Sequence, residues 1–269
     1  MNNIPLAEKM ILDKIADKTR ERVENVKKKV PFAEIKRQAQ ALPKGDFVFE
    51  KAIAKPGLSF ICEVKKASPS KGIIAENFPY LEIASEYEAA GASAISVLTE
   101  PDFFMGSDLY LTEISKAVKL PLLRKDFIID PYQIYEAKIL GASAVLFICA
   151  LIDAKTLKEY IDIANELGLS ALVETHDESE VTFALEAGAK IIGVNNRDLK
   201  NFEVALETSS NLRKLVPDNI LFVAESGIKT RKDILALGNV DAVLIGETLM
   251  RSKDKKLELD RLRGVECSP

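Results

Sequence analysis

Short apolar runs recur along most of this chain and constrain its fold more than any other feature. From Leu58 onward they alternate with amphipathic stretches about every 26 residues, the length of one strand, loop and helix unit. Eight runs are present, at residues 58–65, 94–98, 121–125, 144–148, 170–174, 191–195, 220–225 and 242–246. Eight right-handed units of this length close naturally into a (β/α)8 barrel, the α/β fold class that we predict.

Signals between the runs mark helix boundaries. Asp130 before Pro131 is a good cap followed by a proline at the first helical position. Thr175 and Glu178 have the spacing of a capping box, which gives Glu178 a structural explanation. A doubly wound open sheet is the alternative fold. It is disfavoured because no Gly-x-Gly-x-x-Gly turn follows the first run and because the units number eight.

Residues 1–57 do not follow this rhythm. Apolar and small positions recur there at three- and four-residue intervals on a highly charged segment, at Ile11, Ile15, Thr19, Val23, Val26 and Val30. This spacing predicts an amphipathic helix. We therefore expect residues 1–57 to form an N-terminal helical extension and residues 58–269 to form the barrel, within a single domain overall.

Charge excludes several classes of partner. The 269 residues include 37 Lys and Arg against 41 Asp and Glu, for a net charge of -4. Such a chain has no global cationic field to attract nucleic acid or an anionic membrane, so any anion site is local. No apolar stretch approaches the length that spans a bilayer, and residues 1–10 lack the apolar core of a signal peptide.

Cysteine and histidine usage narrows the chemistry. Cys62, Cys149 and Cys267 are odd in number and far apart, which suits packed thiols in a reducing, cytoplasmic compartment. His176 is the one histidine, so a multi-histidine metal site cannot be built. We expect it to be a loop or orienting residue. Acid and base chemistry then falls to lysine and glutamate.

Polar residues stand where buried strands should end. They are Glu63, Lys65, Lys125, Glu174, Asn195 and Glu225. Functional groups of a barrel sit at these carboxyl ends, and side chains alternate faces along a strand, so Ile61, Glu63 and Lys65 should point inward together. An ion-pair network that closes the barrel mouth would place the same residues there. Their joint occurrence at five strand ends favours a catalytic site.

Glycines in the last two βα loops indicate a phosphate site. Ser226 and Gly227 follow the seventh run, and Gly246 and Glu247 follow the eighth. Glycine lets backbone N–H groups approach an anion closely, and these two loops are the usual phosphate cradle of the fold. The first βα loop, residues 65–72, adds lysines and hydroxyls that would reach the same anion or close over it as a lid.

Six segments in order give the chain a specific likeness: 63–72 (EVKKASPSKG), 96–100 (SVLTE), 123–128 (LRKDFI), 172–176 (LVETH), 193–199 (GVNNRDL) and 224–228 (AESGI). On these motifs the chain resembles the indole-3-glycerol-phosphate synthases over nearly its whole length. The resemblance implies conversion of 1-(2-carboxyphenylamino)-1-deoxyribulose 5-phosphate to indole-3-glycerol phosphate in tryptophan biosynthesis, with loss of carbon dioxide and water and without cofactor or metal. It also implies that the extension helps to cover the substrate over the barrel mouth.

The family pattern assigns roles to the inward residues. It makes Lys125 the acid for ring closure and Glu174 the general base, while Lys65 is a phosphate contact or a second acid. Glu63 and Asn195 would hold the hydroxyl and anilino nitrogen, and Glu225 would orient the ribulose hydroxyls and the lysines. The phosphate positions would be Ser68, Ser226, Gly227, Gly246 and Glu247, and the aryl ring would lie against Phe127, with Phe104 and Leu199.

Glu247 departs from the family pattern, in which many relatives place a small residue. Its charge would oppose a phosphate, so we expect the side chain to point away and only the backbone N–H to contribute.

Other functions remain open at this point. A Schiff-base aldolase would use Lys125 or Lys65 as nucleophile, and a non-catalytic phospho-sugar binding protein would not need Lys125 and Glu174 on opposite sides of a ligand. The isomerase that precedes this step in the pathway would need an inward cysteine, whereas Cys62 has outward parity. We expect a monomer or a weak homodimer.

Overall fold

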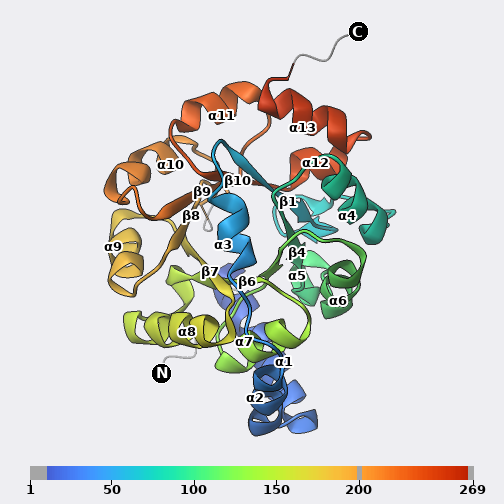
Figure 1. The fold of residues 1–269 in the computed structure, drawn as a ribbon, viewed down its shortest axis with the longest axis vertical. Coiled ribbons are helices and arrows are strands. Elements are labelled where there is room, and N and C mark those ends of the chain that lie inside the picture. The colour runs from blue at the N-terminus through green and yellow to red at the C-terminus, as the bar shows by residue number, and fades with distance from the viewer. Residues whose placement is uncertain (1–10, 199–201, 266–269) are drawn as a thin grey trace.

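The computed structural model describes residues 11–198 and 202–265 and shows a closed, all-parallel eight-stranded barrel (Figure 1). Its strands, in chain order, are β1 (Ser59–Val64), β4 (Ala94–Leu98), β5 (Leu122–Lys125), β6 (Ala144–Ile148), β7 (Ser170–Thr175), β8 (Ile191–Asn195), β9 (Leu221–Glu225) and β10 (Ala242–Ile245). The first strand pairs with both β4 and β10, which closes the sheet. The predicted barrel is confirmed, and the open-sheet alternative is excluded.

Helices surround the barrel as an outer layer (Figure 1). They are α4 (Tyr80–Ala89), α6 (Asp108–Ala117), α7 (Pro131–Ile139), α8 (Ala154–Leu167), α9 (Glu178–Glu186), α10 (Glu207–Leu212), α11 (Arg231–Leu237) and α13 (Lys255–Arg263). Short elements in the connecting loops are β2 (Ala67–Ser68), β3 (Gly72–Ile73), α5 (Pro101–Phe104), η1 (Cys149–Leu151), η2 (Arg213–Leu215) and α12 (Glu247–Arg251). The β2 and β3 segments pair as a small antiparallel hairpin after β1.

Strand alternation divides the apolar core into two layers. Ile61 packs inside the barrel with the inward side chains of the other strands. Phe60 and Cys62 pack in the layer between the barrel and the helices. The inward parity predicted for Ile61 is thus confirmed, and it carries Glu63 to the same face one pleat further along.

The predicted helix starts are half right. Asp130 caps α7, because its carboxylate accepts a hydrogen bond from Tyr132 N at 2.9 Å. The cap of α9 is Asp177, which accepts from Glu180 N at 2.9 Å, and not Thr175. Thr175 belongs to β7, since the strand extends one residue beyond its expected end. The helix therefore begins two residues later than expected, and the capping box predicted from Thr175 and Glu178 is wrong.

The segment before the barrel forms three helices, α1 (Ile11–Lys29), α2 (Phe32–Ala41) and α3 (Val48–Ile53). Phe49 and Ile53 of α3 join the apolar cluster inside the barrel, and Glu50 N donates to the hydroxyl of Ser170 at the start of β7. This places α3 at the amino ends of the strands. Ile15 and its neighbours on α1 instead line a cavity at the carboxyl ends, so the two helices lie at opposite ends of the barrel.

Candidate active site

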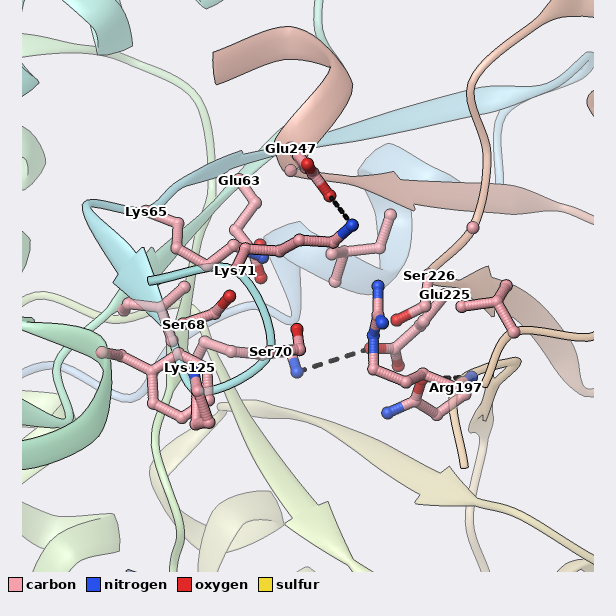
Figure 2. Close-up of a pocket in the computed structure, with 18 of the residues that line it drawn as sticks. Glu63, Lys65, Ser68, Ser70, Lys71, Lys125, Arg197, Glu225, Ser226 and Glu247 are labelled. Carbon is pink, nitrogen blue, oxygen red and sulfur yellow. Dashed lines mark hydrogen bonds and ion pairs between the residues drawn. The ribbon is translucent and has the colours of Figure 1, made fainter. Parts of the chain in front are cut away.

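A cavity of about 520 Å³ opens at the carboxyl ends of the strands (Figure 2). It is lined by all twelve predicted site residues: Glu63, Lys65, Ser68, Lys125, Phe127, Glu174, Asn195, Glu225, Ser226, Gly227, Gly246 and Glu247. The strands bring these residues together because parallel strands end at one rim of the barrel. The placement agrees with the prediction, while the roles of the individual residues remain predictions.

Lys125 is held between two carboxylates at the centre of the cavity. Its Nζ lies 3.4 Å from Glu174 Oε2 and 3.5 Å from Glu225 Oε2. Burial disfavours the ammonium form, but the negative charges of Glu174, Glu225 and Glu63 outweigh this effect and raise the pKa of Lys125. The side chain is therefore a protonated ammonium at neutral pH, as an acid for a carbonyl oxygen must be.

Glu174 is surrounded by donors and cations. Burial favours its protonated form, but Lys125, His176 and Asn195 outweigh burial and lower the pKa of Glu174. Asn195 Nδ2 donates to Glu174 Oε1 at 3.1 Å, and His176 Nε2 lies 3.3 Å from the same oxygen. The carboxylate is thus ionised, which is the form that accepts a proton.

His176 lies between two carboxylates, Glu174 and Glu180. Its Nδ1 lies 3.1 Å from Glu180 Oε2, and the same oxygen accepts the backbone N–H of His176 at 2.8 Å. Burial opposes charge on the imidazole, but Glu174 and Glu180 outweigh it and raise the pKa of His176 to about 10. The expected orienting role fits this contact with Glu174. The sequence analysis did not predict the contact between Glu180 and His176. The four-residue spacing of the two was the available signal.

Glu225 has the opposite titration behaviour to Glu174. Burial and the nearby charges of Glu174 and Glu63 raise the pKa of Glu225 to about 7, against the attraction of Lys125. Within the described residues, Glu225 Oε1 is buried and has no hydrogen-bond partner. A Cβ built on Gly193 would stand 2.3 Å from that oxygen, so a larger residue at this position would displace the Glu225 carboxylate.

Glu63 and Lys65 form an ion pair across the opening of the last βα loop. A Cβ built on Gly246 would lie 2.2 Å from Glu63 Oε2 and 2.9 Å from Lys65 Nζ. Gly246 therefore makes room for the Glu63–Lys65 pair. From the sequence we had expected this glycine to serve the phosphate site alone.

The loop after β9 has the left-handed backbone conformation that can turn N–H groups toward an anion. Ser226 and Gly227 adopt positive φ angles of 66° and 84° in succession. Glu247 Oε1 accepts from Arg251 Nε at 3.0 Å, and its other oxygen lies 3.8 Å from Lys71 Nζ (Figure 2). Its charge is thus paired with cations, including one from the first βα loop, rather than simply directed away.

Three further cations line the cavity: Lys71, Arg197 and Lys229. Lys71 belongs to the first βα loop, whose lysines we expected near the anion, and Figure 2 shows it beside Glu247. Arg197 and Lys229 were not assigned to the site. Arg197 lies in the quoted motif 193–199, so motif membership was the available signal for it.

The wall at the rim beside β4 and β5 is aromatic and aliphatic. Phe104 and Phe127 contact each other with 5.8 Å between ring centroids. Ile11, Leu12 and Ile15 of α1 line the same cavity. Leu199, the third residue expected here, lies outside the described residues.

The fold and this cavity define an enzyme of the (β/α)8-barrel class, with paired lysine and glutamate side chains at the carboxyl ends of the strands. Residues 12–262 match the family model described as "Indole-3-glycerol phosphate synthase". The chain belongs to the indole-3-glycerol phosphate synthase family, and it is accordingly a carboxy-lyase of tryptophan biosynthesis.

Named relatives agree with this family. The chain is 63% identical to the indole-3-glycerol phosphate synthase of Ruminiclostridium cellulolyticum over 95% of its own length and 99% of that protein. It is 58% identical to the enzyme of the same name from Endomicrobium trichonymphae, over 90% of this chain and 95% of that protein.

Solved structures show the same fold at low identity. Thiamine phosphate pyrophosphorylase from Pyrococcus furiosus superposes with a TM-score of 0.59 at 18% identity, covering 77% of this chain and 95% of that chain. The 3-hexulose-6-phosphate synthase of Salmonella typhimurium gives a TM-score of 0.58 at 18% identity, over 77% of this chain and 98% of that chain. These likenesses concern the barrel alone.

Proposed function

We propose that this cavity converts 1-(2-carboxyphenylamino)-1-deoxyribulose 5-phosphate to indole-3-glycerol phosphate, with Lys125 as acid and Glu174 as base. The observation that carries the assignment is the central ion pair. Lys125 is a partly buried ammonium and Glu174 a buried carboxylate, and Lys125 Nζ lies 3.4 Å from Glu174 Oε2 in the cavity. The proposed reaction needs a general acid and a general base within reach of one small substrate, and this pair supplies both.

In the first step, the aryl carbon that bears the carboxylate bonds to the ribulose carbonyl carbon. Lys125 donates a proton to the carbonyl oxygen, which becomes a hydroxyl. The carboxylate then leaves as carbon dioxide, and its bonding electrons restore the aromatic ring. An ammonium whose pKa is raised by neighbouring carboxylates keeps its proton until an oxygen develops negative charge beside it.

In the second step, the new hydroxyl leaves as water and the carbon beside the nitrogen loses a proton. Glu174 takes that proton, while Lys125 or Lys65 protonates the departing hydroxyl. In the absence of substrate, the contact with Lys125 makes Glu174 a weaker proton acceptor. The substrate must therefore separate the two side chains before Glu174 can take the proton. Asn195, which holds Glu174 Oε1, keeps the carboxylate in place during that separation.

The remaining residues bind and orient. Glu63 and Asn195 hold the hydroxyl and the anilino nitrogen, and Glu225 orients the ribulose hydroxyls and the lysines. The phosphate is held by Ser68, Ser226, Gly227, Gly246 and Glu247, and the side-chain charge of Glu247 is paired with Lys71 and Arg251. The aryl ring lies against Phe127 and Phe104.

The direct test is the appearance of indole absorbance when purified protein meets the carboxyphenylamino substrate. Product formation with stoichiometric carbon dioxide supports the proposal. Borohydride treatment with substrate bound separates the rival mechanism, because a Schiff-base aldolase would be trapped covalently at a lysine and this mechanism forms no such bond.

We also infer that the protein acts in the cytoplasm as a monomer or weak homodimer. Buried free thiols at Cys62 and Cys149 support a reducing compartment. Within the described residues, no helix has the length and apolar composition that a membrane crossing requires. Sedimentation velocity over a hundredfold range of concentration tests the oligomeric state, and localisation of a tagged chain by fractionation tests the compartment.

A further inference from the structure

Within residues 11–57 of the extension, Arg22 of α1 contacts two loops at the carboxyl end of the barrel. Its Nη2 lies 2.8 Å from Asp126 Oδ1, and its Nη1 lies 3.8 Å from Glu100 Oε1. Both carboxylates are fully buried, with side chains at most 1% exposed. Asp126 follows β5 directly and Glu100 follows β4, so one guanidinium joins the loops that leave two neighbouring strands.

Each of these carboxylates fixes one phenylalanine of the aryl wall. Asp126 Oδ1, the oxygen that Arg22 contacts, also accepts the backbone N–H of Phe127 at 2.8 Å. Glu100 caps α5 and accepts the backbone N–H of Phe104 at 3.0 Å. Arg22 therefore stands behind the two rings that contact each other at 5.8 Å.

The same face of α1 reaches the cavity. Ile11, Ile15 and Arg22 are spaced by four and seven residues, which puts them on one side of a helix. Ile11 and Ile15 line the cavity, and Arg22 lies two turns beyond Ile15. Fixing Arg22 on Asp126 and Glu100 thus fixes the two isoleucines over the aryl end of the cavity.

We propose that Arg22 is a positioning residue that sets substrate affinity at the aryl end of the cavity by joining α1 to the loops that carry Phe104 and Phe127. The inference rests on the proposed function, because it assigns the aromatic wall to the aryl group of that substrate. Arg22 touches no reacting atom in this arrangement. Its effect is to preorganise the wall before the ligand arrives.

A pair of ligands isolates this effect. The unreactive substrate whose carbonyl has been reduced by borohydride carries aryl group and phosphate, whereas ribitol 5-phosphate carries the phosphate chain without the aryl group. Calorimetry of Arg22→Met should show the Kd of the reduced substrate raised about tenfold or more, with the Kd of ribitol 5-phosphate within twofold of wild type. Steady-state kinetics should show a larger change in KM than in kcat.

Lys27→Met is the matched control. Lys27 fastens the same helix to the barrel through Asp130 at 2.6 Å, but Asp130 caps α7 and holds neither phenylalanine. Both Kd values should therefore stay within twofold of wild type. Arg22→Lys is the conservative variant. A lysine forms a point contact with one carboxylate, so the affinity for the reduced substrate should fall between those of wild type and Arg22→Met.

Three results would overturn the inference: unchanged affinity for the reduced substrate in Arg22→Met, an equal loss for both ligands, or an equal loss in Lys27→Met. If Arg22→Met does not fold, Arg22→Lys is judged by the same criteria. The proposed function fails separately, when wild-type protein neither binds the reduced substrate nor forms product.

Discussion

Lys125 and Glu174 face each other across the end of β6, with 3.4 Å between Nζ and Oε2. The two residues come from β5 and β7, so the intervening strand separates them in the sheet while their side chains meet above it. Without substrate, the two residues that we propose as acid and base are therefore paired with each other. Under that proposal, a substrate bound between them would separate the ion pair and leave each group able to act on the substrate.

Replacing Lys125 by Met tests the acid. The variant keeps similar bulk and removes the ammonium, so kcat should fall by about a hundredfold or more while KM changes much less. Stopped-flow or steady-state assays of indole formation measure it. Near wild-type turnover with unchanged binding would disprove the assignment and make Lys65 the first candidate.

Replacing Glu174 by Gln tests the base. The amide keeps the shape and the contact with Asn195 but cannot accept the proton, so kcat should fall by about a hundredfold or more. If dehydration is the blocked step, quenched reactions should contain a cyclised and decarboxylated intermediate that retains its hydroxyl. Mass spectrometry distinguishes it from substrate by the loss of carbon dioxide. A fully active Glu174→Gln enzyme would refute this role.

Gly246→Ala probes the space beside the Glu63–Lys65 pair. Because the new Cβ would stand 2.2 Å from Glu63 Oε2, the pair must shift, so kcat should fall together with the rise in KM. Loss of phosphate binding alone would raise KM without lowering kcat. Gly188→Ala is a control at a remote helix end, where nothing lies within 4 Å of the added Cβ, and it should affect stability rather than kinetics.

Two truncations separate the parts of the extension. Removing residues 1–40 takes away α1 and most of α2 but keeps α3, so we expect a folded barrel with a raised KM. Removing residues 1–57 also takes Phe49 and Ile53 from the barrel interior, which should cost about 5 kcal/mol or more of stability. Circular dichroism melts and kinetics measure both. A shorter truncation that unfolds, or that keeps wild-type kinetics, would contradict the covering role.

Glu225→Gln should change how stability depends on pH. The pKa of Glu225 is raised to about 7 from an ordinary 4.5, so its favourable contribution is complete below pH 4.5 and is lost as pH rises through 7. Wild type should therefore lose stability relative to the Gln variant between about pH 5 and pH 8. Urea unfolding at both pH values gives the difference. The groups that face Glu225 are Lys125, Glu174 and Glu63, and a difference independent of pH would contradict this titration.

The sequence predicted the barrel and the inward residues because both follow from local rules. The two-residue period of a strand places Ile61 and Glu63 on the same face. Because parallel strands end at one rim of the barrel, the proximity of Lys125 and Glu174 could be predicted without knowing any distant contact. The same reasoning did not reach Glu180 or Arg22. Their contacts depend on how α9 and α1 dock on the barrel, and charged residues on helices usually face solvent.

The place of α3 was also beyond sequence reasoning. The helix spans only six residues, too short for a reliable period, and its Phe49 and Ile53 resemble any apolar pair in a connecting segment. Arg124 is similar. It alternates outward on β5 and is buried against Asp108 and Glu136, partners that only the packed helices supply.

The side chains of Phe49 and Ile53, which pack inside the amino end of the barrel, affect how ligands can enter and leave the enzyme. In the part of the chain that the structure describes, these two side chains fill the amino end of the barrel and the cavity opens at the carboxyl end. Under the proposed function, substrate and products would therefore enter and leave at the carboxyl end. Carbon dioxide and water are small enough to leave past a bound sugar phosphate, whereas the ring of the product would have to pass Ile11 and Ile15 of α1. We therefore expect α1 to slow the release of the indole product more than that of the small molecules.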